Sequence, residues 1–219
     1  MQDEGELYAA QGSIAPELAA EFPGLQLLWV SVEARLRSSP PGLKRRLSML
    51  SSRYRGENVI AMRTQPIPHA FRAFFRQVGL DPDVTRIPAE AAAVQRLLHG
   101  GFESRNVVDD ARLIAVIETG VPVWALDADL VAVGGLGIRV TEANAELGSG
   151  EYAKPLAAGQ LAVADGRLIH ALLFDDVAPG HGVGRFTERA VLYAVGVEGV
   201  PTIHIEEALW IAVEAMRTA

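Results

Sequence analysis

The chain has 219 residues, 49% of them hydrophobic and 21% charged, so it can bury a sizeable core, and we expect one domain over residues 1–219. It has no cysteine, which excludes disulfides, thiolate nucleophiles and thiolate zinc sites. The N-terminus carries Asp3, Glu4 and Glu6 rather than a basic segment, and no apolar stretch approaches the roughly 20 residues that span a bilayer, so we expect a cytoplasmic protein without a membrane partner.

The first half of the chain combines one strand with several helices. Apolar residues in succession and then in alternation predict a strand over residues 24–36. Pro40 and Pro41 end this strand and open a helix that has leucines at helical spacing. A second helix begins after Pro66, carries a stripe of phenylalanines and ends at Gly79.

Two further helices follow. The third begins at Pro88, and the spacing of its larger apolar residues predicts that Val94, Leu97 and Leu98 face the core. The fourth covers residues 109–119, where an aspartate could cap the free backbone N–H groups of the first turn.

From residue 122 onward the periodicity changes toward two, as in strands. Five segments fit this pattern: 121–127, 135–140, 160–165, 167–174 and 190–197. Asp165 and Gly166 predict a hairpin turn between the third and the fourth of them. A final helix is expected over residues 206–216. Helices first and strands later indicate an α+β fold rather than alternating βαβ units.

Charge is unevenly distributed along the chain, whose formal net charge is −7. Residues 35–105 carry 13 basic and five acidic side chains, a net charge of +8, whereas residues 1–34 and 106–219 carry −6 and −9. Such asymmetry can direct an anionic partner to one face of a protein. We therefore predict RNA contacts from arginines of the basic segment, namely Arg45, Arg46, Arg53, Arg55, Arg72 and Arg76.

Several motifs of the middle of the chain follow one another in an informative order. An arginine-rich helix leads to a Gly-x-Asp-Pro loop, an Arg-x-Pro helix start, a Val-Asp element, a Gly-x-Pro strand that ends in Asp, and an arginine. These features fall on Arg72, Gly79, Asp81, Pro82, Arg86, Pro88, Glu90, Val108, Asp109, Gly120, Pro122, Asp127 and Arg139. In this order they resemble the B3/B4 domain of the β subunit of bacterial phenylalanyl-tRNA synthetase, and so many matches in register are more specific than any single motif.

The resemblance implies a B3/B4-like fold, with N-terminal helices packed on a largely antiparallel, barrel-like sheet. It also implies a proofreading role, because the synthetase domain hydrolyses tyrosine wrongly attached to phenylalanine tRNA, using the tRNA to position water. A free-standing protein of this kind would be a trans-acting aminoacyl-tRNA deacylase that needs no cofactor. A non-catalytic RNA- or tRNA-binding module, and a protein that binds or hydrolyses small amino-acid derivatives, are the alternatives.

The chain departs from the synthetase pattern at positions that matter for chemistry. Trp124 stands where the synthetase strand carries a histidine. The Thr-Asn pair that follows the Val-Asp element is not reproduced around Asp110, Ala111 and Arg112. Glu188 is nearest in order to the pocket glutamate of the family. If activity persists, other groups must support it.

Candidate site residues follow from both lines of reasoning. His181 is a more credible acid–base group than His170 because it lies in a glycine-rich loop. The alternative is that His181 is a solvent-exposed turn residue. The resemblance places Asp127 at a strand end and suggests Glu188 as the third member of a catalytic set. The remaining predicted pocket residues are Asp109, Asp110, Arg112, Trp124 and His170. The two aspartates of this group could instead cap a helix, and His170 could be a core residue.

Other chemistries find little support. No G-x-S-x-G elbow is present, which disfavours a Ser-His-Asp hydrolase. His204 and Glu206 have no third ligand nearby, so we predict no metal site. The glycines of residues 180–184 have the wrong spacing for a phosphate-binding loop, so we predict no nucleotide cofactor.

Overall fold

A computed structural model describes residues 9–54 and 56–218. Its elements, in chain order, are β1 (Ala10–Gln11), β2 (Ser13–Ile14), α1 (Pro16–Glu21), β3 (Gln26–Glu33), α2 (Pro41–Arg53), α3 (Gly56–Met62), α4 (Pro66–Gln77), α5 (Pro88–His99), α6 (Val107–Thr119), β4 (Val123–Asp127), η1 (Ala128–Leu130), η2 (Val133–Gly135), β5 (Gly137–Val140), β6 (Glu146–Leu147), η3 (Gly150–Tyr152), β7 (Lys154–Pro155), β8 (Leu161–Ala164), β9 (Ile169–Leu172), β10 (Arg189–Gly196) and α7 (Thr202–Arg217).

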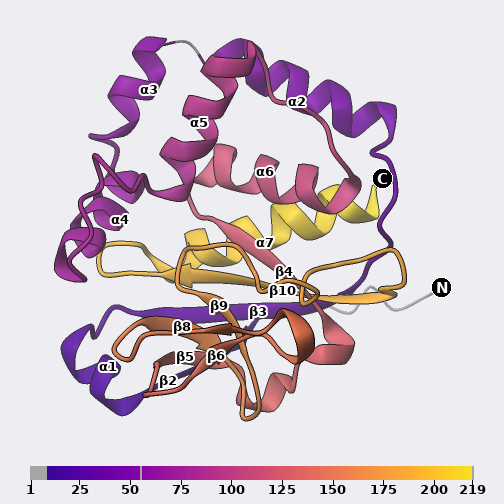
Figure 1. Cartoon of the computed structure of the whole chain (residues 1–219). Helices are drawn as coiled ribbons and strands as arrows, with labels where there is room; N and C mark the ends of the chain where they lie inside the picture. Colours follow the sequence, from indigo (N-terminus) through magenta and orange to yellow (C-terminus); the bar gives the residue numbers. More distant parts are fainter. Residues whose placement is uncertain (1–8, 55, 219) are drawn as a thin grey trace.

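The elements form layers. A four-stranded antiparallel sheet has the order β1-β3-β10-β4, and a six-stranded sheet has the order β2-β5-β8-β9-β6-β7. Helices α6 and α7 lie against the four-stranded sheet, with α2, α3 and α5 beyond them and α4 to one side, while the six-stranded sheet lies on the other side (Figure 1). One cluster of buried apolar side chains runs through helices and both sheets, so the layers share a core.

Strand β10 is the centre of the four-stranded sheet, between β3 and β4. Residues 190–196 are all buried, because helices cover one face of the strand and the second sheet covers the other. This double burial explains the nearly continuous apolar sequence of the strand. Gly196 is needed where α7 crosses, since a Cβ at this position would overlap Ile205 of that helix.

Helix α6 begins earlier than the sequence predicted. Asn106 is its N-cap, and its Oδ1 accepts hydrogen bonds from the backbone N–H of Val108 (3.1 Å) and Asp109 (2.9 Å). Asp109 and Asp110 therefore lie inside the first turn, and the expectation that either one caps the helix is wrong. The earlier start matters for function because it orients both carboxylates by helical geometry rather than by a loop.

The buried face of α5 also differs from the prediction. Leu97 is 39% exposed and Leu98 71% exposed, although both were expected to face the core. The buried residues of this helix are Ala89, Glu90 and Ala93. Glu90 turns inward because its carboxylate pairs with buried Arg72 of α4, at 3.0 Å, and this ion pair decides which face of the helix is inside.

The α+β class is confirmed, since helices and largely antiparallel strands occupy separate layers. The exceptions to antiparallel pairing are β2 with β5 and β6 with β9. A closed barrel is not seen: within the described residues, no pairing joins the two edge strands of either sheet. No helix of this part of the chain is both long and apolar enough to cross a bilayer.

Candidate functional site

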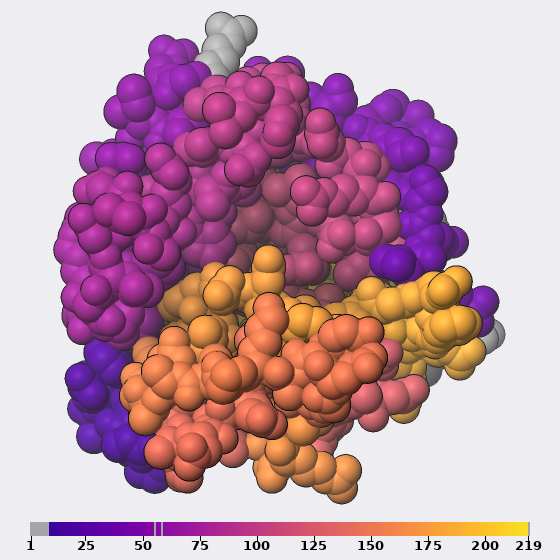
Figure 2. Space-filling view, viewed as in Figure 1, coloured from indigo at the N-terminus to yellow at the C-terminus, as the bar shows by residue number. Residues whose placement is uncertain are grey.

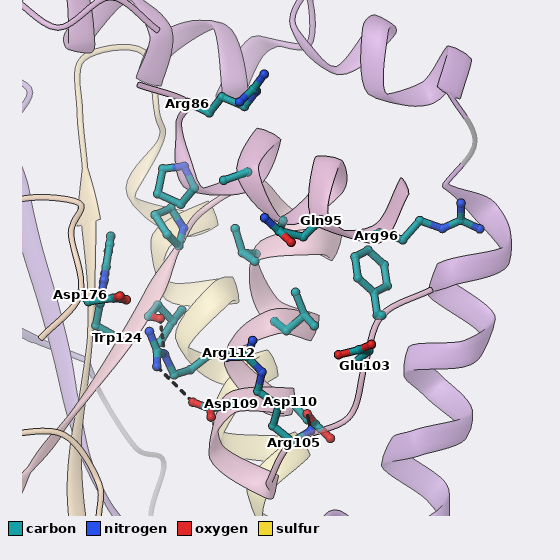
Figure 3. Close-up of a pocket in the computed structure, with 18 of the residues that line it drawn as sticks. Arg86, Gln95, Arg96, Glu103, Arg105, Asp109, Asp110, Arg112, Trp124 and Asp176 are labelled. Carbon is teal, nitrogen blue, oxygen red and sulfur yellow. Dashed lines mark hydrogen bonds and ion pairs between the residues drawn. The ribbon is translucent and has the colours of Figure 1, made fainter. Parts of the chain in front are cut away.

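A cavity of about 520 Å³ opens between α5, α6, the start of β4 and the loop after β9. Figure 2 shows the surface hollowed where the helical part of the chain faces the segments that follow β9. The lining combines aromatic, apolar and charged side chains from stretches that are far apart in the sequence (Figure 3). A polar ligand with an apolar part could therefore be held from several sides.

Aromatic rings form one wall. Trp124 is 4% exposed, stacks on Tyr193 with 5.4 Å between ring centroids, and donates its indole N–H to the Asp175 carbonyl oxygen at 2.9 Å. Phe174 lies 6.0 Å from Trp124 and also packs on the phenylalanines of α4. The wall is thus continuous with the core, which keeps it rigid.

The loop after β9 has a strained backbone. Phe174 has φ of 66°, in the left-handed region that bulky side chains rarely adopt. Its ring is held by the surrounding aromatic cluster, so packing offsets the backbone strain. The next two residues, Asp175 and Asp176, both line the cavity. The strained residue therefore immediately precedes two acidic residues of the cavity lining.

An ion pair lies on the helical side of the cavity, where Figure 3 shows Asp109 and Arg112 next to each other. Their closest oxygen and nitrogen atoms are 3.4 Å apart, and Arg112 also donates its Nε–H to the Val123 carbonyl oxygen at 2.8 Å. Asn106 donates to the other Asp109 oxygen at 2.7 Å. Both side chains remain partly exposed, so they are oriented by the protein yet still able to contact a ligand.

Asp110 has a different role. It is 1% exposed, and its two oxygens accept hydrogen bonds from the Ser104 hydroxyl (2.5 Å) and the Arg105 backbone N–H (2.9 Å). These bonds tie the loop between α5 and α6 to the helix. Asp110 therefore shapes the cavity by holding this loop, rather than by offering a free carboxylate.

Charges of both signs surround the cavity. Among the described lining residues, the cations are Arg86, Arg96, Arg105 and Arg112. The anions are Glu103, Asp109, Asp110, Asp175 and Asp176. His99 also lines the cavity, at the end of α5. Such a site can bind an ammonium group through carboxylates and a phosphate or carboxylate through arginines, while an apolar group contacts the aromatic wall.

Four of the five predicted pocket residues line this cavity: Asp109, Asp110, Arg112 and Trp124. The fifth, His170, is a fully buried residue of β9 in the six-stranded sheet and is absent from the lining. It lies against His181 instead, with 3.0 Å between the two Nδ1 atoms. The alternative that His170 belongs to the interior is the one that its position fits.

The three predicted catalytic residues lie outside the cavity. Asp127 accepts hydrogen bonds from the Thr187 hydroxyl (2.5 Å) and from the backbone N–H of Asp129 (3.0 Å). Glu188 borders a second cavity, which several arginines line. His181 is 2% exposed, which corrects the expectation of an open loop residue.

The physical reason for the burial of His181 is its bonding. Its carbonyl oxygen accepts from the Asp127 backbone N–H at 2.9 Å, and its ring packs on His170. Burial, followed by the nearby His170, lowers the pKa of His181 below its usual value. Burial also lowers the pKa of His170, outweighing the opposite effect of Asp165. Both imidazoles are therefore neutral at pH 7.

The predicted RNA-contact arginines fall into different environments. Arg45, Arg53 and Arg76 are exposed. Arg46 binds Glu118 through two hydrogen bonds, of 3.0 and 2.6 Å. Arg72 departs from the expected surface role, because it is 5% exposed and pairs with the buried carboxylate of Glu90 as well as with the exposed carboxylate of Asp83. The prediction for Arg55 lies outside the described residues.

Sequence reasoning missed part of the lining. Phe174 is the last residue of a predicted strand, and Asp175 and Asp176 follow it directly. Acidic residues in a loop after a strand are a usable signal for a binding site. Arg96 and Phe102 gave no such signal, because an arginine and a phenylalanine near a helix end are common on any surface.

A scan of protein-family models finds no match for the chain, and a search of curated proteins finds none either. Among residues 9–54 and 56–218, no three histidine or carboxylate side chains are grouped so that they could hold a metal ion.

Proposed function

We propose that the protein binds the aminoacyl end of a charged tRNA in this cavity and hydrolyses its ester bond, as a free-standing relative of the B3/B4 editing domain. The observation that carries the proposal is the cavity itself, which combines an aromatic wall, an oriented carboxylate and several arginines. These are the groups that an amino-acid side chain, an α-ammonium and a phosphate require.

Each part of the ligand has a partner. The amino-acid side chain packs against Trp124 and Phe174, and the α-ammonium binds Asp109, which Asn106 and Arg112 hold in place. Terminal phosphates of the tRNA bind arginines of the lining. The tRNA itself positions the attacking water, as the resemblance implies, so no histidine is needed at position 124.

The experiment is a deacylation assay with purified protein and a panel of correctly and wrongly charged tRNAs. At least one ester should be hydrolysed about 10-fold or more faster than without protein, a modest effect for positioned acid–base catalysis. Asp109→Asn should remove most of this acceleration. Asp129→Asn, at a side chain that is 76% exposed and outside the cavity, is the matched control and should retain it. If deacylation is not accelerated for any tRNA of the panel, the proposal is wrong.

Binding without catalysis is the second candidate function. It is favoured by the bonding of two cavity residues, since Asp110 uses both oxygens to hold a loop and Trp124 fills space where the family carries an imidazole. In this case uncharged tRNA should bind with a steep salt dependence while no ester is hydrolysed. A thermal shift with amino acids but none with tRNA would instead indicate a small-ligand protein.

A further inference from the structure

Four polar side chains form a continuous chain outside the cavity. Ser149 Oγ lies 3.3 Å from His181 Nε2, and His181 Nδ1 lies 3.0 Å from His170 Nδ1. His170 Nε2 lies 3.2 Å from Asp165 Oδ2. The four residues come from positions up to 32 residues apart, and none of them lines the cavity. This row of four side chains connects the exposed hydroxyl of Ser149 to the buried carboxylate of Asp165.

The carboxylate fixes where the protons lie. Burial acts to raise the pKa of Asp165, but hydrogen bonds from the backbone N–H groups of residues 132, 168 and 167, together with His170, outweigh it and lower the pKa to about 2. An ionised carboxylate only accepts hydrogen bonds, so the nitrogen that faces it, His170 Nε2, carries hydrogen. His170 is neutral, and its Nδ1 is therefore an acceptor.

The same logic continues outward. Since His170 Nδ1 accepts, the nitrogen opposite it, His181 Nδ1, must donate, and His181 is neutral as well. Its remaining nitrogen, Nε2, then has a free lone pair that points at the Ser149 hydroxyl. One arrangement of protons thus fits the three contacts, with an electrostatic approach rather than an aligned hydrogen bond between His170 Nε2 and Asp165, and it leaves a base directed at a serine.

The backbone presents Ser149 to solvent. The residue is exposed, whereas His181 is 2% exposed and His170 fully buried. It stands between Gly148 and Gly150, which have φ of 81° and 69°, values that favour glycine. A Cβ at Gly148 would lie 3.1 Å from Ala178 Cβ and 3.7 Å from His181 Nε2, so the glycine allows the turn to approach the imidazole.

We propose that Ser149 is a nucleophile activated by His181, forming a site for acyl transfer from carboxylic esters that is separate from the cavity. Ser149 Oγ forms a bond to the ester carbonyl carbon while its proton moves to His181 Nε2. The bond from that carbon to the alcohol oxygen then breaks, and His181 returns the proton to the departing oxygen. Water repeats the two steps on the acyl-serine and releases the carboxylic acid.

His170 and Asp165 are positioning residues in this scheme. They hold the His181 tautomer and stabilise the imidazolium that forms when it takes the serine proton, as the buried carboxylate of a triad does. The charged groups that act on the pair are Asp165 and Arg139, the latter opposing protonation of His170. Asp165→Asn should therefore lower kcat for an ester with little change in KM, and shift the pH profile of the rate.

The first test is labelling with diisopropyl fluorophosphate, in which Ser149 Oγ displaces fluoride from phosphorus. Peptide mass mapping of the intact protein should find the adduct on Ser149. Ser149→Ala and His181→Gln should lose it, while Ser48→Ala, at an exposed serine of α2, should label at Ser149 as the native chain does. No adduct on Ser149, or equal labelling of His181→Gln, overturns the proposal.

The second test covers the case in which His181→Gln fails to fold. Because the chain has no cysteine, Ser149→Cys and Ser48→Cys each create a single thiol. The nearby imidazole should favour the thiolate, so iodoacetamide should alkylate the Ser149→Cys protein about 10-fold faster than the Ser48→Cys protein at pH 7. The alkylation rate of Ser149→Cys should also reach half of its maximum at a lower pH. Equal rates and profiles would overturn the proposal. Neither test uses tRNA, so its outcome is independent of the function proposed for the cavity.

Discussion

Replacing Trp124 by histidine tests the role of the aromatic wall. The side chain is 4% exposed, stacks on Tyr193 with an interplanar angle of 11°, and donates a hydrogen bond to the Asp175 carbonyl oxygen. Truncating a buried tryptophan to alanine costs about 3 to 5 kcal/mol, and an imidazole refills roughly half of the space. Loss of the stacked pair adds about 1 kcal/mol. We expect Trp124→His to lower the free energy of unfolding by about 2.5 to 3.5 kcal/mol, measured by urea denaturation.

Activity should move in the opposite direction. If the cavity is arranged for ester hydrolysis, an imidazole at position 124 supplies an acid–base or water-orienting group, and deacylation of a mischarged tRNA should rise about 10-fold. Trp29→His is the matched control, because Trp29 lies across β10 from Trp124, opposite the same Tyr193, but does not line the cavity. It should lose stability without gaining activity.

The result that would refute this reasoning is a Trp124→His protein with unchanged stability and unchanged deacylation. Trp124 would then be neither a packed residue nor part of the functional cavity. A loss of stability without a gain in activity would retain the packing but remove the proposed correspondence between Trp124 and the editing histidine.

Three further outcomes are expected. Glu90→Gln should lower the free energy of unfolding by about 3 kcal/mol in urea, because it removes the buried carboxylate partner of Arg72 and leaves only the exposed carboxylate of Asp83 opposite it. An effect near zero would mean that the pair is not formed. Both buried histidines, His170 and His181, have lowered pKa values in the folded protein, so the unfolded chain binds protons at a higher pH than the folded one does. The contribution of this pair to stability is therefore present above about pH 6.5 and is lost as the pH falls below it. The urea concentration at the midpoint of unfolding should decrease as the pH is lowered from 7.5 to 5. His170→Gln should make this pH dependence weaker. Replacing exposed Arg45 and Arg53 by glutamine should leave the fold intact and reduce the slope of log K against log salt concentration for tRNA binding by about 2, since each lost phosphate contact releases about one counterion fewer. An unchanged slope would exclude α2 from the interface.

Local sequence pattern determined most of the secondary structure. Five segments with a period of two after residue 122 became β4, β5, β8, β9 and β10, and proline starts marked α2, α4 and α5. Turn chemistry at Asp165 located the hairpin between β8 and β9. These features depend on neighbouring residues alone, so they can be predicted without knowledge of the fold. Helix α3 and the two-residue strands were missed, since so short a segment has no detectable period.

Part of the cavity was also foreseeable. Asp109, Asp110, Arg112 and Trp124 were chosen from the order of motifs, and all four line it. The separate duties of the two aspartates were not, because they depend on contacts with the loop before α6: Asp110 holds that loop, whereas Asp109 pairs with Arg112 beside the open space.

Only the tertiary structure decided which polar groups meet. Glu90 faces the core of the helical layer because Arg72, 18 residues earlier, lies opposite it. Ser149 meets His181 across 32 residues, and His181 meets His170 across a strand and a loop. A sequence can show that a side chain is titratable, but its protonation and its reach depend on burial and on partners that the folded chain brings together. For that reason the absence of a G-x-S-x-G elbow argued against an activated serine, whereas the fold places the neutral imidazole of His181 beside Ser149.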